Sequence, residues 1–482
     1  MTPEHHSLPQ FSQLPQLDQA AQQAWQQGRA RYAVDLYLAN LHQFERYPGA
    51  WYNCAFYLRH AGDFQLAIEH YQRALKLGID SPEEVWLNIG VIHNEGLLDN
   101  QAALAAFEQA LALRPNYLPA LLNLGNCHEQ QGDRSAAAAC FRKVIELEPI
   151  NGYAFARLAD VTQFDASADP LISAMQQLLA QANLPHDDHV DLLFALGKAH
   201  DDCAEFATAF SFYQQANKLN AQRMPAWQAE QQQAFARAQT AWLEVEPTAN
   251  SVGAQGIPVF ICGMFRSGST LLEQMLGAHS EVSTGGELDF FARFDPARRG
   301  QAATNALARQ LGAEYLNFVS ERLPAQRYFT DKRPDNIWRM GLIKRALPEA
   351  KFIVTKRHPL DNALSVYFTR LGAGMNYANS ISDTLAFIAQ QEQLLTEWQQ
   401  DFGADIYTID YEQVVQQPEQ QLRALLEWLD LPWQAACLDF HQRRNSVRTA
   451  SVWQVRQPLY TRSIQRYKNY AEFLPPWPEP KQ

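Results

Sequence analysis

The sequence lacks the patterns that would place it in a membrane or in a disulfide-stabilised fold. Its most apolar run, residues 257–265, is nine residues long, whereas a transmembrane helix needs about 20. The six cysteines contain no CxxC pair, which argues against a zinc site or a disulfide framework and favours buried, reduced thiols. Residues 1–17 have neither a basic segment nor an apolar core, so they do not resemble a secretory signal. We therefore expect a cytoplasmic protein without a membrane span.

An excess of basic charge is also missing. The 482 residues carry a formal net charge of −12; residues 1–256 hold 15 basic and 28 acidic side chains, whereas residues 257–482 hold 25 and 24. This difference predicts two domains with different partners. Nucleic acid is not expected among them, because the chain is acidic and its basic side chains concentrate in one short segment, residues 441–470.

The first half of the chain repeats itself with a period of 34 to 36 residues. Each unit has the pattern of two amphipathic helices, with small residues where the helices cross and aromatic residues filling the gap to the next pair. Matching positions are Ala55, Ala67 and Tyr71; Gly90, Ala103 and Phe107; Gly125, Ala137 and Phe141; and, in a weaker copy, Gly197, Ala209 and Tyr213. The pattern resembles the tetratricopeptide repeat, which implies an α-solenoid over residues 15–235 whose groove binds a protein or peptide.

The second half opens with the pattern of a phosphate-binding loop. After a predicted linker, residues 236–256, comes an apolar run typical of a buried parallel strand, residues 257–262. A glycine-bearing loop and a helical pattern from Leu271 follow. This order creates an anion site, because backbone N–H groups and the helix dipole point at one spot. Ser269 stands where a nucleotide triphosphatase has its lysine, which argues against an ATPase or a GTPase.

Three motifs of this region resemble the sulfotransferases that use 3′-phosphoadenylyl sulfate, and among them the tyrosylprotein sulfotransferases. The motifs are Arg266-Ser-Gly-Ser-Thr270, Ala278-His279 and Gly285-Gly-Glu287. The resemblance implies a P-loop-like, three-layer α/β domain with a parallel sheet over residues 257–475. The expected fold is therefore an α-solenoid followed by an α/β domain.

The same resemblance implies which residues bind the donor. In this family the loop holds the 5′-phosphosulfate, an arginine and a serine after a second strand hold the 3′-phosphate, and a strand-end tyrosine and a closing loop lie near the donor. The strands expected before that arginine and that tyrosine are residues 351–355 and 405–410. The matching residues of this chain are Arg266, Ser267, Gly268, Ser269, Thr270, Arg357, Ser365, Tyr411, Ser451 and Arg456.

Catalysis is assigned by the resemblance to three residues. Arg266 and Lys332 stabilise the bridging and sulfuryl oxygens, and Glu287 acts as general base, with Asp289 as the alternative base. The chemistry requires no metal, because the donor carries its own leaving group, and no cluster of metal ligands stands out in the sequence.

Two positions depart from the tyrosylprotein pattern. Thr369 replaces an arginine, with Arg370 one position later, and Gln457 replaces a lysine near the closing loop. His279 and His358 are interpreted as structural residues. Donor binding therefore transfers from the family, whereas the identity of the acceptor does not.

The expected function is sulfuryl transfer from 3′-phosphoadenylyl sulfate to an acceptor hydroxyl, with the repeats recruiting the acceptor or a partner protein. A peptide or protein tyrosine, a saccharide and a small metabolite all remain candidate acceptors. One alternative is a repeat scaffold whose sulfotransferase-like domain binds nucleotide without turnover. Another is a kinase or nucleotide triphosphatase, which Ser269 and the lack of an obvious Mg²⁺ carboxylate disfavour.

Overall fold

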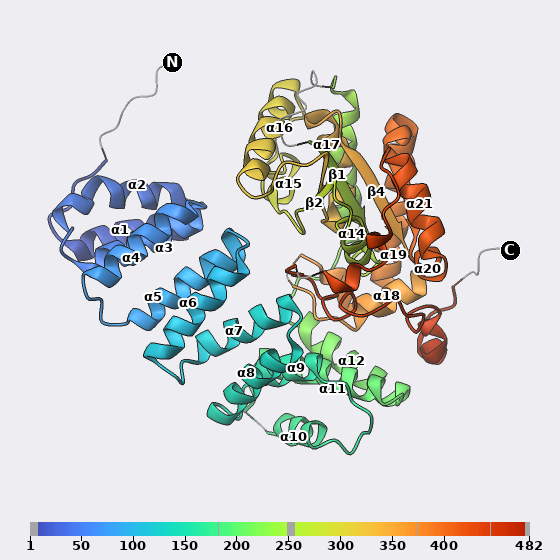
Figure 1. Cartoon of the computed structure of the whole chain (residues 1–482), viewed down its shortest axis with the longest axis horizontal. Coiled ribbons are helices and arrows are strands. Elements are labelled where there is room, and N and C mark those ends of the chain that lie inside the picture. The colour runs from blue at the N-terminus through green and yellow to red at the C-terminus, as the bar shows by residue number, and fades with distance from the viewer. Residues whose placement is uncertain (1–7, 182, 248–255, 373, 444, 478–482) are drawn as a thin grey trace. The chain divides into compact units, whose positions relative to one another are not determined.

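A computed structural model describes residues 8–181, 183–247, 256–372, 374–443 and 445–477 (Figure 1). The first seven residues of the amino-terminal segment and residues 248–255 of the predicted linker, which include Ser251 and Gly253, lie outside the described residues. The chain divides by its internal contacts into two compact units, Met1–Pro149 and Ile150–Gln482.

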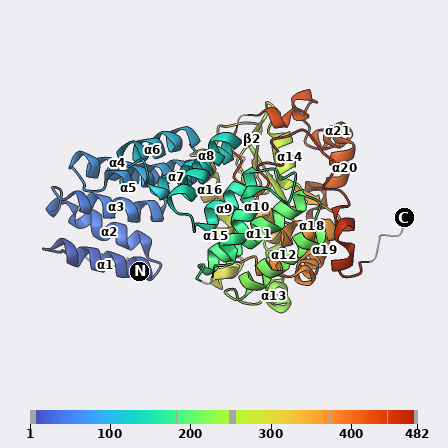
Figure 2. The same ribbon diagram turned by 90° about the horizontal axis from the view of Figure 1, so that it is seen from below.

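The first unit consists of antiparallel helix pairs, which Figure 2 shows stacked in chain order. Proline stands in the first turn of α1, α3, α5 and α7, where the missing N–H group leaves no helical bond unmade. The pairs are α1 (Leu14–Gln26) with α2 (Ala30–Asn40), α3 (Pro48–Ala61) with α4 (Phe64–Lys76), α5 (Pro82–Val91) with α6 (Asn100–Leu113), and α7 (Leu118–Gln131) with α8 (Arg134–Leu147). A π-helical turn, η2 (Ile92–Gly96), follows α5.

The repeated small and aromatic residues pack against each other inside each pair. A Cβ atom built on Gly90 would lie 2.4 Å from the Phe107 ring, and one on Gly125 would lie 2.7 Å from the Phe141 ring. The aromatic residues therefore fill the crossing of their own pair. Phe107 also shares a buried cluster with residues of α7. It therefore helps to fill the gap to the next helix pair, as the repeat pattern predicted.

The second unit begins with further helices. They are α9 (Gly152–Val161), α10 (Pro170–Leu179), α11 (His186–Asp202), α12 (Phe206–Ala221), α13 (Ala229–Thr240) and η3 (Ala241–Glu244). A Cβ atom on Gly197 of α11 would lie 2.7 Å from the Tyr213 ring of α12, so this pair keeps the packing of the repeats. By its contacts the α11–α12 pair nevertheless belongs to the second unit. The described part of the predicted linker is largely helical, because it contains the end of α13 and η3. The division at residues 235–257 thus remains a prediction drawn from the sequence.

The rest of the second unit is built on five parallel strands in the order β2-β3-β1-β4-β5. The strands are β1 (Ile257–Gly263), β2 (Val282–Thr284), β3 (Tyr328–Asp331), β4 (Lys351–Lys356) and β5 (Ile406–Asp410). The strands predicted at 257–262, 351–355 and 405–410 are therefore confirmed as β1, β4 and β5. The sequence pattern did not identify β2 and β3, which have three and four residues.

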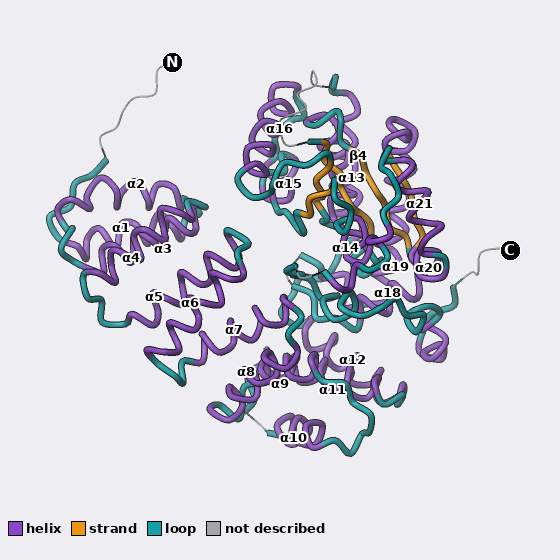
Figure 3. Tube along the Cα trace, in the orientation of Figure 1, coloured by secondary structure: helices purple, strands orange, loops and turns teal. Residues whose placement is uncertain are grey.

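Helices cover both faces of the sheet, which gives the three layers that the resemblance implied (Figures 1 and 3). Val259 and Ile261 of β1 pack in one cluster, with residues of α14 and α21, while Phe260 and Cys262 pack in another, with residues of α16, α17 and α19. The helices are α14 (Ser269–Leu276), α15 (Phe290–Arg293), α16 (Asn305–Ser320), α17 (Met340–Ala346), α18 (Pro359–Tyr367), α19 (Ile381–Phe402), α20 (Tyr411–Gln416) and α21 (Pro418–Trp428). A buried face on each side explains the continuous apolar run of β1.

Two absences concern the described part of the chain. No helix described there is long and apolar enough to cross a membrane. All six cysteines lie among the described residues, where they form no disulfide; five are buried and Cys203 is partly exposed.

Candidate active site

The predicted site residues lie at the carboxyl ends of the strands. Arg266 follows β1, Glu287 follows β2, Lys332 follows β3, Arg357 follows β4 and Tyr411 follows β5. Because parallel strands all end at the same edge of a sheet, residues up to 145 positions apart meet there. β1 lies between β3 and β4, so its loop stands where the chain order of the strands reverses, which is the usual ligand position in such sheets.

The loop after β1 holds an unusual backbone conformation. Gly268 has φ +100°, and a Cβ atom there would lie 2.6 Å from the Tyr411 ring, so glycine alone fits. Arg266 has φ 68°, in the left-handed region that costs a non-glycine residue about 1 kcal/mol or more. The loop leads into α14, which begins at Ser269 and whose first-turn N–H groups have no partner inside the helix. Such N–H groups form an anion site.

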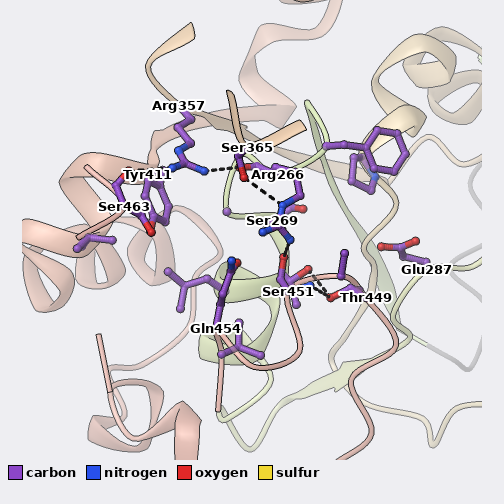
Figure 4. Close-up of a pocket in the computed structure, with 18 of the residues that line it drawn as sticks. Arg266, Ser269, Glu287, Arg357, Ser365, Tyr411, Thr449, Ser451, Gln454 and Ser463 are labelled. Atoms are coloured by element: carbon purple, nitrogen blue, oxygen red, sulfur yellow. Dashed lines mark hydrogen bonds between the residues drawn. The ribbon is translucent and has the colours of Figure 1, made fainter. Parts of the chain in front are cut away.

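A cavity of about 240 Å³ lies over this loop (Figure 4). Nine of the predicted site residues line it: Arg266, Gly268, Ser269, Thr270, Glu287, Arg357, Ser365, Tyr411 and Ser451. Figure 4 shows Arg357 and Tyr411 at one end of the cavity and Glu287 at the other, with Arg266 and Ser269 between them.

Three predicted residues do not line the cavity. Ser267 is buried, and its hydroxyl bonds to the Met264 carbonyl and the Thr355 hydroxyl, each at 2.6 Å, which fixes the loop. The guanidinium of Arg456 donates to the backbone carbonyls of Arg443 and Asn445. These two residues support the walls of the site instead of facing it.

Lys332 is the third of these residues, and it lies directly behind the cavity wall. It is buried, and its Nζ donates to Glu287 Oε1 at 2.5 Å. Lysine and glutamate thus form an ion pair whose carboxylate faces the cavity.

The opposite end of the cavity is cationic. Arg357 donates to the carbonyls of Arg266 and Ser463, at 3.0 and 2.8 Å, and its guanidinium carbon lies 4.9 Å from the centre of the Tyr411 ring. Among the residues that the structure describes, Arg266 donates only to hydroxyl groups, from Nε to Ser365 at 3.2 Å and from Nη1 to Ser451 at 2.5 Å. Within the described ranges, no carboxylate forms an ion pair with either arginine.

The charge of Arg266 is therefore poorly compensated. Burial, and next to it the charge of Arg357, lower the pKa of Arg266 to about 10. Two cavity arginines without a carboxylate partner among the described residues are suited to bind an anion with more than one negative group.

The sequence reasoning missed several residues that line the cavity. They are Tyr460, Ser463 and Arg466, among others. Arg466 pairs with Asp201 of α11, which raises its pKa, and its guanidinium carbon lies 5.2 Å from the centre of the Phe368 ring. The excess of positive charge in residues 441–470 was the sequence signal for Arg466. It could not reveal the partner Asp201, which lies 265 positions earlier in the chain.

The two departures from the tyrosylprotein pattern have clear structural outcomes. Arg370 does not reach the cavity, because it pairs with Asp187 and Asp191 of α11, each at 2.6 Å. Thr369 donates its hydroxyl to the Ser365 carbonyl at 2.9 Å, and Gln457 does not line the cavity.

The segment that carries Arg466 is fixed by Asp361 of α18. The two carboxylate oxygens of this buried residue accept the backbone N–H groups of Gln465 and Tyr467, each at 2.7 Å. Gln465 has φ 57°, so these bonds also hold a strained backbone. The His358 ring stacks on Tyr467 with centroids 4.6 Å apart, while His279 bonds to the Pro432 carbonyl at 2.9 Å, contacts typical of structural histidines.

Replacement of Asp361 tests this support. Asp361→Ala is expected to lower the free energy of unfolding by about 3 kcal/mol, because two hydrogen bonds to a charged acceptor are lost and two backbone N–H groups are left without an acceptor. Asp361→Asn keeps one carbonyl acceptor and is expected to cost about half as much. Urea denaturation of both variants provides the measurement; equal stabilities for Asp361→Ala and the unaltered protein would show that water replaces the carboxylate.

Comparison with known proteins agrees with this architecture. Residues 258–435 match the family model described as the sulfotransferase family, and residues 48–80 and 99–160 match two tetratricopeptide repeat models. The chain carries tetratricopeptide repeats followed by a sulfotransferase-family domain. The resemblance to repeat-bearing sulfotransferases that the sequence motifs indicated is thereby confirmed, and so is the predicted fold class.

Similar proteins include an uncharacterized protein and several protein-tyrosine sulfotransferases. An uncharacterized protein of Aquifex aeolicus (strain VF5) is 26% identical over 423 residues, which are 82% of this chain and 54% of that protein. Protein-tyrosine sulfotransferase 1 of Danio rerio is 25% identical over 194 residues, 37% of this chain and 55% of the relative. The chain thus spans about half the length of these curated relatives. Among solved structures, the sulfotransferase domain from the curacin biosynthetic pathway is 18% identical with a TM-score of 0.35, and covers 46% of this chain and 93% of its own.

Proposed function

We propose that the protein transfers a sulfuryl group from 3′-phosphoadenylyl sulfate to an acceptor hydroxyl. The observation that carries this proposal is the cavity in which Arg266 and Arg357 have no carboxylate partner among the described residues. The donor has negative groups at both its 5′ and 3′ positions, so it would supply the counter-charges of these two arginines. Membership of the domain in the sulfotransferase family supports the same donor.

The donor-binding roles follow from the two ends of the cavity. Arg357 and Ser365 would bind the 3′-phosphate, since a guanidinium pairs with phosphate through two parallel bonds. The first-turn N–H groups of Ser269 and Thr270, with Arg266, would bind the 5′-phosphosulfate. Tyr411 would pack beside the adenosine.

The reacting groups lie at the Glu287 end. In the transfer, the acceptor oxygen forms a bond to sulfur while the bond from sulfur to the 5′-phosphate oxygen breaks, which releases 3′,5′-adenosine bisphosphate. Glu287 would take the proton of the acceptor hydroxyl, and Arg266 would stabilise the charge that develops on the leaving phosphate. Lys332 already donates to Glu287, so it would hold the base in place and stay close to the sulfuryl oxygens.

The acceptor is proposed to be a protein or peptide. The named relatives include protein-tyrosine sulfotransferases, and the repeats of the first unit belong to a class that binds proteins. On this proposal the repeats recruit the acceptor, and a tyrosine hydroxyl is the group modified.

Calorimetric titration tests the donor site. We expect 3′,5′-adenosine bisphosphate to bind at least about tenfold more tightly than 5′-AMP or ATP–Mg²⁺, because the latter two lack a 3′-phosphate for Arg357. Arg357→Ala should remove this preference, while the control Arg423→Ala should keep it, because Arg423 pairs with Glu419 on α21 and neither residue lines the cavity. Equal affinity for all three nucleotides would contradict the proposed donor, and tighter binding of ATP–Mg²⁺ would revive the kinase alternative.

A further inference from the structure

Glu273 is a buried carboxylate beside the candidate active site to which no role has been given. It lies on α14, four positions after Ser269, and is 3% exposed. Its Oε1 accepts two hydrogen bonds, from the backbone N–H of Gly286 at 3.0 Å and from the Thr330 hydroxyl at 2.7 Å. A carboxylate is costly to bury, so its partners indicate what it does there.

Those bonds fix the turn that carries Glu287. Gly286 has φ +65°, a left-handed conformation that glycine adopts without strain. Its N–H is held by Glu273, and its carbonyl accepts the backbone N–H of Lys332 at 2.8 Å. The turn is therefore tied to α14 on one side and to the end of β3 on the other, with Glu287 immediately after it.

The side chains of this region form one electrostatic group. Burial raises the pKa of the Glu273 carboxyl, the nearby charge of Lys332 lowers it, and Glu287 raises it. Two further groups interact with Glu273: Arg443, whose pKa burial lowers while the charge of Glu273 opposes this, and Asp331, whose carboxyl is held well above its usual pKa by burial.

We propose that Glu273 is a positioning residue that both orients Glu287 and strengthens it as a base. With both glutamates ionised, Glu273, Lys332 and Glu287 carry a net charge of −1, and a proton taken from the acceptor hydroxyl brings this charge to zero. Without the Glu273 charge, the same proton would leave a net positive charge in a largely buried place, which is less favourable. This inference rests on the proposed role of Glu287.

The substitution Glu273→Gln separates charge from shape. A glutamine oxygen still accepts from Gly286 and Thr330, so the turn is retained while the charge is removed. Glu281→Gln is the matched control, since it makes the same change at a more exposed carboxylate that lies 3.6 Å from Arg327. Glu273→Asp keeps the charge but shortens the side chain that reaches Gly286 and Thr330, so it separates the loss of these contacts from the loss of the charge.

The first readout is the titration of Glu287 in the full chain, followed by NMR of ¹³C-labelled glutamate carboxyl groups. The Glu287 signal is identified by its loss in Glu287→Gln. We expect Glu287 to titrate about one pH unit lower in Glu273→Gln, and at an unchanged pH in Glu281→Gln. An unchanged midpoint in a folded Glu273→Gln protein would overturn the inference.

The second readout is sulfuryl transfer, which separates this inference from the proposed function. The acidic limb of the kcat–pH profile should move about one pH unit lower in Glu273→Gln, with a lower plateau and unchanged affinity for 3′,5′-adenosine bisphosphate. Transfer with an unshifted limb would overturn the role of Glu273. A shifted titration without transfer to any acceptor would leave the Glu273–Glu287 coupling in place and overturn the proposed function.

Discussion

Removal of residues 1–149 is expected to leave a folded protein that still binds 3′,5′-adenosine bisphosphate, whereas removal of residues 1–256 should abolish folding. The sequence places the boundary of the α/β domain at residue 257, but the contacts place α9 to η3 in the same compact unit as the sheet. The two truncations therefore test whether these helices are a separate module or a structural part of the sulfotransferase domain.

The apolar core favours the second possibility. The Tyr213 ring of α12 stacks on Phe368 with centroids 3.9 Å apart, and Phe210 stacks on Phe473 at 4.5 Å. Trp242 of η3 is 1% exposed and belongs to the same cluster as the strand residue Phe260. Each large aromatic side chain that loses its partner exposes apolar surface worth about 2–3 kcal/mol, and a few such losses equal the whole stability of a domain.

Polar contacts across the same boundary point the same way. Asn217 of α12 donates to the Tyr367 carbonyl at 2.8 Å, and the fully buried Gln239 of α13 donates to Asp295 at 2.9 Å. Deleting these helices would also leave Arg466 and Arg370 without their carboxylates on α11. Partly buried charges without a partner add to the destabilisation.

Circular dichroism during thermal unfolding, with calorimetric titration of the bisphosphate, provides the measurement. A cooperative transition and unchanged affinity are expected for residues 150–482, and neither for residues 257–482. A folded, ligand-binding fragment 257–482 would show that α9 to η3 form an independent module after all.

The fold was predictable where the local pattern was strong. The repeated small and aromatic residues identified the helix pairs, the apolar runs of β1 and β4 identified buried strands, and the resemblance placed β5 before Tyr411. β2 and β3 were missed because three or four residues are too few for a strand pattern, and their place in the sheet depends on pairing with distant segments.

The site was predictable where residues follow strands in recognisable motifs. Nine of the twelve predicted residues line the cavity, because a motif keeps its place after its strand. Arg466 escaped prediction because its position depends on Asp361 and Asp201, which come from other elements. Ser267 and Arg456 match the family pattern in sequence, but packing turns their side chains toward the protein backbone.

Arg266→Gln is expected to make the protein more stable and at the same time to weaken bisphosphate binding by about 100-fold or more. Burial, and next to it the charge of Arg357, lower the pKa of Arg266 to about 10, so below that pH the folded protein carries this charge at a cost in free energy relative to the unfolded chain. That penalty is about 3 kcal/mol, and loss of the two bonds to hydroxyl groups offsets 1–2 kcal/mol of the gain. A rise of about 1 kcal/mol in the free energy of unfolding remains.

Arg370→Gln is the matched control, for which the expected change in the free energy of unfolding has the opposite sign. Its two aspartate partners raise the pKa of Arg370, so the folded state favours the charged form, and loss of the charge leaves Asp187 and Asp191 without their cation. This variant should be less stable, yet bind the bisphosphate as before, because Arg370 does not line the cavity. Urea denaturation without ligand and calorimetry with ligand measure both quantities. If Arg266→Gln were destabilised as much as Arg370→Gln, the cavity would hold a counter-charge for Arg266 within the protein itself, and the case for a donor anion as its partner would fail.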